Sequence, residues 1–141
     1  MAATAGGCGA SSAPSRAEFA KRADFTCAVA NRSAPQSTPR TAKQAARYTQ
    51  AQIVGRSALD AKLRKLSVAK GERGDFDAFN ADTAQLIGVL RQHNAAARAK
   101  DENRYAKLQD RFGTIAQQRE ATAIRLGFRI CGRSLASGPK K

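Results

Sequence analysis

Residues 101–132 read DENRYAKLQDRFGTIAQQREATAIRLGFRICG and hold the clearest amphipathic pattern of the chain. One set of side chains recurs in steps of three and four, which places it on one face of a helix: Tyr105, Leu108, Phe112, Ile115, Arg119, Thr122 and Leu126. Acidic residues at 101 and 102 favour a helix start, and Gly127 favours a helix end because glycine readily adopts the left-handed conformation. The stretch therefore predicts a helix over residues 101–126, followed by a tail that buries Phe128 and Ile130.

Two capping boxes predict the first two helices of the chain. Ser15 and Glu18 have the S-x-x-E spacing and precede a helix that ends near residue 31. Thr41 and Gln44 have the equivalent spacing before a helix over residues 42–69. The intervening prolines, at positions 35 and 39, cannot continue a helix.

A third helix is predicted to begin at Asp75, and its apolar stripe consists of Phe76, Phe79, Thr83, Leu86, Leu90, His93 and Ala97. Neither proline nor glycine separates it from the last helix. However, the stripe continued in phase would reach Lys100 and Arg104, whereas the apolar positions shift to Tyr105 and Leu108. A turn near residues 100–101 explains this change of phase.

Four amphipathic helices with short links predict an all-α fold, an antiparallel four-helix bundle with a short first helix. Residues 1–14 are small and polar without periodicity, so we expect a disordered tether there. The bundle domain is expected over residues 15–132, and a disordered basic tail over residues 133–141.

Three glycines lie near the middle of the second, third and fourth predicted helices: Gly55, Gly88 and Gly113. Each costs about 1 kcal/mol relative to alanine in a helix. Close approach of the helices or a small pocket at mid-bundle would explain them, and chance use of glycine is the alternative.

The net charge of +14 predicts an anionic environment. Basic residues concentrate in the second predicted helix, and its candidate anion-binding side chains are Lys43, Arg47, Arg56, Lys62, Arg64 and Lys65. They spread over more than half of the helix circumference, so a solvated surface is the alternative to attraction by a membrane or cell-wall surface. Specific binding of nucleic acid is not expected, because no reading helix, zinc framework or aromatic platform is evident.

The sequence offers no catalytic constellation. His93 is the sole histidine, so no second imidazole is present for a metal site, and Asp75, Asp77 and Asp82 have helix-start or solvent explanations. We therefore expect a non-enzymatic protein without a metal or cofactor.

The chain has three cysteines, at positions 8, 27 and 131. In an up-down-up-down bundle the start of the first helix and the end of the fourth lie at the same end. A Cys27–Cys131 bridge is therefore compatible with this geometry, and two free thiols behaving as small apolar residues are the alternative.

Cys8 follows small residues and precedes a Gly/Ser/Pro-containing tether, an arrangement that resembles a bacterial lipobox. In that setting the thiol would carry a lipid. Ala5 stands where the motif usually has leucine, and no charged or apolar leader precedes it in the given sequence. The alternative is an ordinary cysteine in a floppy N-terminus.

Together, Phe19, Ala23-Asp24, Cys27, Ala96-Ala97 with Asp101, and the segment AIRLGFRICG at residues 123–132 resemble a class of uncharacterised secreted proteins and lipoproteins of high-GC Gram-positive bacteria. The resemblance covers residues 18–132. It departs at Phe128, where a second leucine is usual, and at residues 68–71, where a proline pair is common. It implies a helical bundle outside the cytoplasm with Cys27 bridged to Cys131, and it implies no known activity.

We therefore expect a non-enzymatic extracytoplasmic helical domain, lipid-anchored through Cys8 or secreted if a signal peptide precedes the given start. Its expected partner is another protein or an anionic envelope component. The alternative is a cytoplasmic basic helical protein that binds nucleic acid with all three cysteines reduced.

Overall fold

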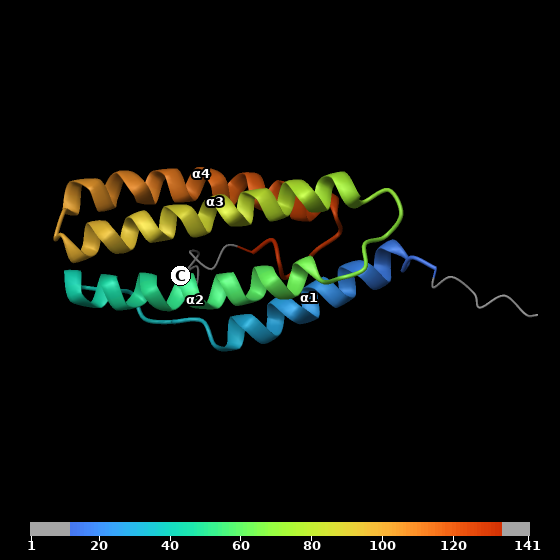
Figure 1. Cartoon of the computed structure of the whole chain (residues 1–141), viewed down its shortest axis with the longest axis horizontal. Helices are drawn as coiled ribbons and strands as arrows, with labels where there is room; N and C mark the ends of the chain where they lie inside the picture. Colours follow the sequence, from blue (N-terminus) through green and yellow to red (C-terminus); the bar gives the residue numbers. More distant parts are fainter. Residues whose placement is uncertain (1–11, 134–141) are drawn as a thin grey trace, which may run out of the picture.

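The computed structural model describes residues 12–133, and within that range the chain forms four helices and no strand. The helices are α1 (Arg16–Arg32), α2 (Ala42–Arg64), α3 (Arg73–Arg98) and α4 (Glu102–Arg125). They alternate in direction along a common axis, which confirms the predicted antiparallel four-helix bundle (Figure 1). Most of the predicted tether and all but the first residue of the predicted tail lie outside the described residues.

The helix starts follow the local signals closely. At α1 the Ser15 hydroxyl accepts from the Glu18 amide and the Glu18 carboxylate accepts from the Ser15 amide, so the first capping box is complete. At α2 the Thr41 side chain accepts from the Gln44 amide, but the Gln44 side chain accepts from the Arg40 amide instead. The second predicted capping box therefore forms only in its first half.

The C-terminal end of α2 differs from the prediction, because the helix stops at Arg64 rather than near residue 69. Ala69 is buried, and Leu66 and Val68 pack against the same apolar cluster. The chain turns back at this point toward the start of α3, and these three side chains close the end of the core on the way.

The turn predicted before α4 and the glycine termination predicted after it both occur. Lys100 adopts a φ of +56° between α3 and α4, and Asp101 caps α4 by accepting from the Arg104 amide at 3.0 Å. Gly127 has a φ of +77°, and the Phe128 amide donates back to the Ala123 carbonyl at 2.9 Å. This geometry ends α4 and reverses the chain.

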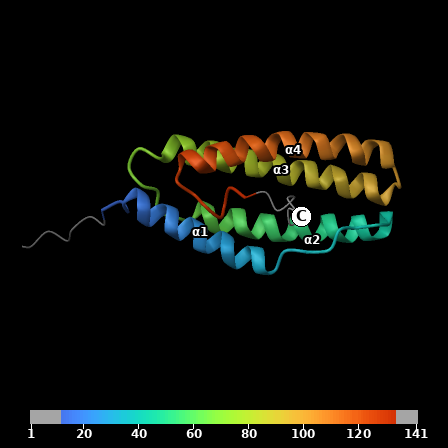
Figure 2. The ribbon, with the colours of Figure 1, turned by 180° about the vertical axis from the view of Figure 1, so that it is seen from behind.

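The tail beyond α4 lies alongside α1, as both ribbon views show (Figures 1 and 2). The sulfur atoms of Cys27 and Cys131 lie 2.05 Å apart and form the disulfide, with their Cα atoms 5.3 Å apart. The Asp24 carboxylate accepts from three consecutive tail amides, those of Arg129, Ile130 and Cys131, at 2.8–3.1 Å. α1 packs on α2 and on this tail, and the Arg16 side chain also donates to the Arg125 carbonyl at the end of α4.

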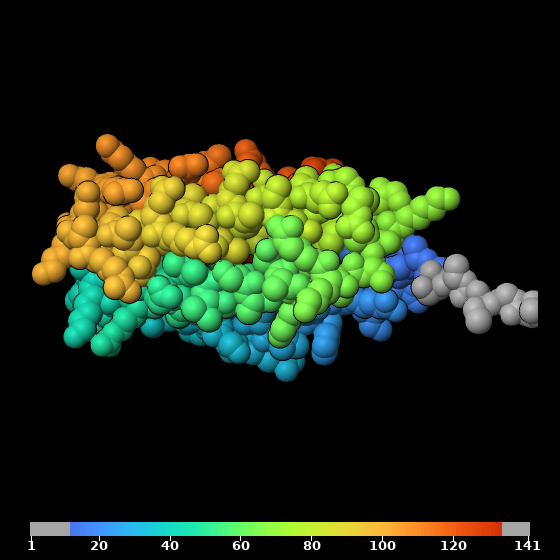
Figure 3. All heavy atoms as spheres, in the orientation of Figure 1, coloured from blue at the N-terminus to red at the C-terminus, as the bar shows by residue number. Residues whose placement is uncertain are grey.

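The core has two parts along the bundle axis. The first lies where α1 and the tail are present, and its centre is a set of four rings whose contacting pairs have centroids 5.1–6.5 Å apart: Phe19, Phe76, Phe79 and Phe128. The second belongs to α3 and α4, with Ile53 of α2 packed against it, and is centred on Leu86, Leu90, Leu108, Phe112 and Ile115. The space-filling view shows an elongated molecule in which α1 covers only part of the length (Figure 3).

Candidate functional site

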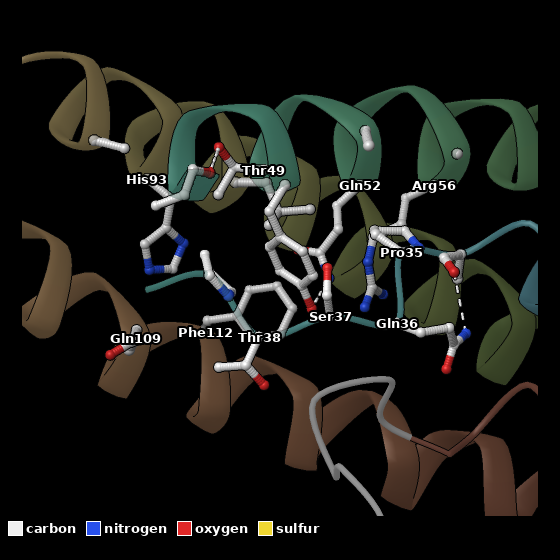
Figure 4. Close-up of a pocket in the computed structure, with 18 of the residues that line it drawn as sticks. Pro35, Gln36, Ser37, Thr38, Thr49, Gln52, Arg56, His93, Gln109 and Phe112 are labelled. Carbon is white, nitrogen blue, oxygen red and sulfur yellow. Dashed lines mark hydrogen bonds between the residues drawn. The ribbon is translucent and has the colours of Figure 1, made fainter. Parts of the chain in front are cut away.

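A pocket of about 1060 Å³ occupies the half of the bundle that α1 does not reach. With 17 residues, α1 is shorter than its neighbours, which have 23–26. Residues 33–41, which contain two prolines, replace a fourth helix there and cross the opening between α2 and α4 (Figure 4). The pocket is a direct consequence of this mismatch in helix length. Its inner wall is formed by Tyr48, Thr49, Gln52, Arg56, Leu90, His93, Tyr105 and Phe112.

Arg56 is the cationic side chain inside this pocket. It follows Gln52 by four residues and precedes Leu59 by three, so helical geometry directs it inward together with them. Only 8% of the residue is exposed, and its Cζ lies 5.4 Å from the centre of the Phe112 ring. Figure 4 shows its guanidinium pointing into the pocket.

The charge of Arg56 is not compensated within the described part of the chain. Its Nε is buried without a hydrogen-bond partner, and none of the ion pairs in residues 12–133 involves it. Burial lowers the pKa of Arg56, but a guanidinium still remains protonated at neutral pH. The pocket therefore holds a desolvated positive charge.

His93 presents a second unpaired polar group. The residue is 4% exposed, and neither Nδ1 nor Nε2 has a hydrogen-bond partner among the described residues. Its ring centroid lies 4.7 Å from that of Tyr105 and 6.2 Å from that of Phe112. Burial lowers the pKa of His93, and the nearby Tyr105 backbone opposes this effect, although no contact between the two residues has hydrogen-bond geometry. The imidazole is therefore neutral at pH 7.

The remaining polar side chains of the α2 wall are already satisfied. Gln52 donates to the Tyr48 hydroxyl at 3.0 Å, and Thr49 donates to the Ala45 carbonyl at 2.9 Å. Asn94 of α3 in turn donates to the Thr49 hydroxyl at 3.0 Å. These bonds fix the wall around Arg56 and His93, which line the pocket and keep buried nitrogen atoms without a hydrogen-bond partner.

A second buried arginine lies between the two parts of the core. Arg119 donates to the Thr83 hydroxyl and to the Cys131 carbonyl, each at 2.8 Å, and its Cζ lies 4.1 Å above the Phe79 ring. Burial and repulsion from Arg56 lower the pKa of Arg119 to about 10, against the attraction of two aspartates at positions 60 and 82. Arg119 is thus hydrogen-bonded within the protein, and its charge adds to the positive potential around Arg56.

The six predicted anion-binding residues do not form one surface. Arg56 is inside the pocket and Lys62 lies at its edge, whereas Lys43 and Arg47 line a separate shallow hollow. Arg64 is paired with an aspartate of its own helix at 2.8 Å. Lys65 caps the exposed end of α2. Their role in binding an anion stays a prediction, and the structure separates the buried member from the surface ones.

The glycine hypothesis has a mixed outcome. A Cβ added at Gly55, Gly88 or Gly113 would meet nothing within 4 Å, so the idea that these residues permit close helix packing is wrong. Gly55 and Gly113 nevertheless line the pocket, as the pocket explanation expected, whereas Gly88 does not.

The remaining residues that the sequence analysis considered for catalysis or lipidation are either in ion pairs or outside the described residues. Asp75 pairs with Arg125 at 3.2 Å and Asp77 with Arg73 at 3.7 Å, while Cys8 lies outside the described residues. Within residues 12–133, no group of three His, Cys, Asp or Glu side chains is arranged to hold a metal ion. In the same range no helix combines the length and apolarity that a membrane crossing requires.

Comparisons with protein-family models, with curated proteins and with solved structures found no match. The function of the chain is therefore inferred from the pocket. The sequence predicted Arg56 as one of six anion-binding candidates and a mid-bundle pocket as one explanation of the glycines, but it did not bring Arg56 and His93 together in that pocket. Two signals pointed to the site: the short first helix before a proline-containing link, and the position of Arg56 within the inward stripe of α2.

Proposed function

We propose that the protein is a non-enzymatic, extracytoplasmic binding domain that holds an anionic ligand in the pocket beneath residues 33–41. One observation carries the proposal: Arg56 is a buried cation without a counter-ion in the described chain, and it faces a cavity large enough for a small molecule.

The energetics favour an anion over a neutral ligand. A buried charge without a partner is costly, and a guanidinium forms paired hydrogen bonds with carboxylate or phosphate oxygens. A hydrogen bond to a charged group contributes about 1.5–3 kcal/mol. Because Arg119 is already hydrogen-bonded to the protein, Arg56 is the group whose free energy an anion would lower most.

The disulfide supports an extracytoplasmic location for the protein. Cys27 and Cys131 are 104 residues apart, and bridges of this kind persist in oxidising compartments. The net charge of +14 would hold such a domain close to an anionic membrane or cell-wall surface. A lipid on Cys8 remains part of this hypothesis, and the alternative remains a cytoplasmic nucleic-acid binder with reduced cysteines.

Anion binding is tested by thermal unfolding in a series of sodium salts at equal ionic strength, with chloride as reference. Acetate, benzoate and phosphate are compared with benzyl alcohol, which lacks the charge. We expect at least one of the three anions to raise the melting temperature of the protein but not of Arg56→Met. The matched control is Arg91→Met, which removes an exposed arginine of α3 that does not line the pocket and should respond like the original protein. Equal melting temperatures in all salts would contradict the proposal.

The subcellular location is tested by mass spectrometry of the protein isolated from its native cells. Its cysteines are alkylated in one sample before reduction and in a second sample after reduction. A peptide joining Cys27 to Cys131 that lacks two hydrogens supports an oxidising compartment. Full alkylation of both thiols before reduction, together with salt-dependent retention on DNA, would favour the cytoplasmic alternative.

A further inference from the structure

We infer that the ligand of this pocket is an aromatic monocarboxylate that carries a hydroxyl group at the end opposite its carboxylate. The inference rests on the proposed anion-binding function and specifies the class of ligand. It follows from three features of the pocket: one unpaired cation, one unpaired neutral imidazole, and an aromatic ring between them.

The number of buried charges limits the charge of the ligand. Among the pocket-lining residues of the described chain, Arg56 is the one buried cation, while four cations, Arg40, Lys62, Lys100 and Arg133, and two acids, Asp101 and Glu102, are exposed. A phosphate dianion or a dicarboxylate would bring a second negative charge into this desolvated space without a second buried partner. A single carboxylate matches both the charge of Arg56 and the paired donors of its guanidinium.

The state of His93 requires a group that both donates and accepts. A neutral imidazole has one N–H donor and one acceptor nitrogen, and both ring nitrogens of His93 are buried and unpaired within the described chain. Leaving such a group without partners is costly. A hydroxyl can donate to one imidazole or accept from it, whichever tautomer is present, whereas a plain hydrocarbon end leaves it unsatisfied.

The space between the two polar groups suits a flat ring. The Phe112 ring lies between them, with the Arg56 Cζ 5.4 Å and the His93 centroid 6.2 Å from its centre (Figure 4). Two glycines on facing helices, Gly55 and Gly113, line the same pocket, and a Cβ on either would meet open space. An aromatic ring packed against Phe112 in offset or edge geometry would span from the guanidinium to the imidazole.

The test uses isothermal titration calorimetry of the full chain with 4-hydroxyphenylacetate as the probe. Phenylacetate lacks the hydroxyl, 4-hydroxyphenethyl alcohol lacks the carboxylate, and octanoate lacks the ring. We expect 4-hydroxyphenylacetate to bind most tightly. We expect phenylacetate to bind about tenfold more weakly, because it leaves His93 unpaired, and the alcohol to show no measurable binding.

Variants assign each contact. Arg56→Met should abolish binding of both acids, and it should fold because it replaces a buried charge with an apolar side chain of similar length. Arg56→Lys keeps the charge without the paired donors and should weaken binding. His93→Phe should bind the two acids equally, since it removes the group that recognises the hydroxyl. Arg91→Met serves as the control and should bind like the original protein, and circular dichroism checks the folding of every variant.

The outcomes separate this inference from the proposed function. If octanoate or phosphate binds more tightly than 4-hydroxyphenylacetate, or if the two aromatic acids bind equally to the original protein, the ligand class is wrong while anion binding stands. If the alcohol binds as well as the acid, or no anion in either experiment binds in a manner that depends on Arg56, both are wrong.

Discussion

Replacing Asp24 with alanine should destabilise the protein strongly, because this half-buried carboxylate joins the C-terminal tail to α1. It accepts from the amides of Arg129, Ile130 and Cys131 at 2.8, 2.8 and 3.1 Å. Three consecutive amides converging on one carboxylate resemble the arrangement at a capped helix start, here made across about 105 residues of chain. The substitution removes all three acceptor contacts at once and leaves the disulfide in place.

The size of the effect can be estimated from the surroundings of each amide. The Arg129 residue is exposed, so its amide can bond to water in the variant. The Ile130 and Cys131 amides are in partly buried bonds, and each charge-assisted bond contributes about 1.5–3 kcal/mol. Counting only those two bonds, the free energy of unfolding should fall by about 3–6 kcal/mol. For a domain of this size, that corresponds to a decrease in melting temperature of roughly 10–25 °C.

The measurement is urea unfolding at pH 7 under non-reducing conditions, followed by far-ultraviolet circular dichroism. The control is Asp77→Ala, which removes an exposed carboxylate whose arginine contact is long, at 3.7 Å, and should change stability by less than about 0.5 kcal/mol. Asp24→Ala should also make the Cys27–Cys131 bridge easier to reduce with dithiothreitol, because the tail is held less firmly. A loss below about 1 kcal/mol, with an unchanged rate of reduction, would refute this account of the tail.

Three further measurements probe the same fold. Replacing both Cys27 and Cys131 with serine should lower the free energy of unfolding by about 4–5 kcal/mol in the chain-entropy account. Urea unfolding of the original and variant proteins measures this difference, and a loss under about 1 kcal/mol would contradict the chain-entropy account. Gly88→Ala should raise the free energy of unfolding by about 0.5–1 kcal/mol, because the added Cβ meets open space. Gly132→Ala should lower it by about 1–3 kcal/mol, because its Cβ would lie 2.8 Å from a methyl carbon of α4. Thermal melts in which both variants shift stability in the same direction would be inconsistent with this packing. Burial lowers the pKa of His93 below 6.5, so the unfolded chain binds a proton more readily than the folded chain. The stability of the original protein relative to His93→Gln should therefore decrease as the pH falls from about 7 to about 5, and a pH-independent difference in unfolding free energy would argue against a buried neutral imidazole.

Local patterns in the sequence were sufficient for the helices and for most of their ends. The inward stripe of the last helix, the capping box at Ser15, the turn at residue 100 and the left-handed Gly127 all depend on residues within a few positions of one another. Such signals act through backbone geometry and side-chain period, so they can be recognised without the rest of the fold. The end of α2 was predicted wrongly because the burial of Ala69 depends on the distant chain against which it packs.

The candidate site could not be predicted in the same way. Arg56 was grouped with the surface cations of its helix, since charge alone does not reveal which face a side chain occupies when the neighbouring stripe is weak. His93 was placed correctly on the inner face of its helix. That both of its ring nitrogens would lack partners depends on the chain that surrounds it.

By itself, the sequence determined an all-helical chain of four amphipathic segments, with their order and direction. It left the Cys27–Cys131 bridge open, and the structure forms that bridge between α1 and the tail. The tertiary structure alone decided that α1 stops partway along its neighbours, that a pocket opens there, and that Arg56 and His93 face it while Asp24 holds the tail. The physical reason is that helix formation is governed by contacts a few residues apart, whereas a cavity and its unpaired charge exist only where segments far apart in the chain meet or fail to meet.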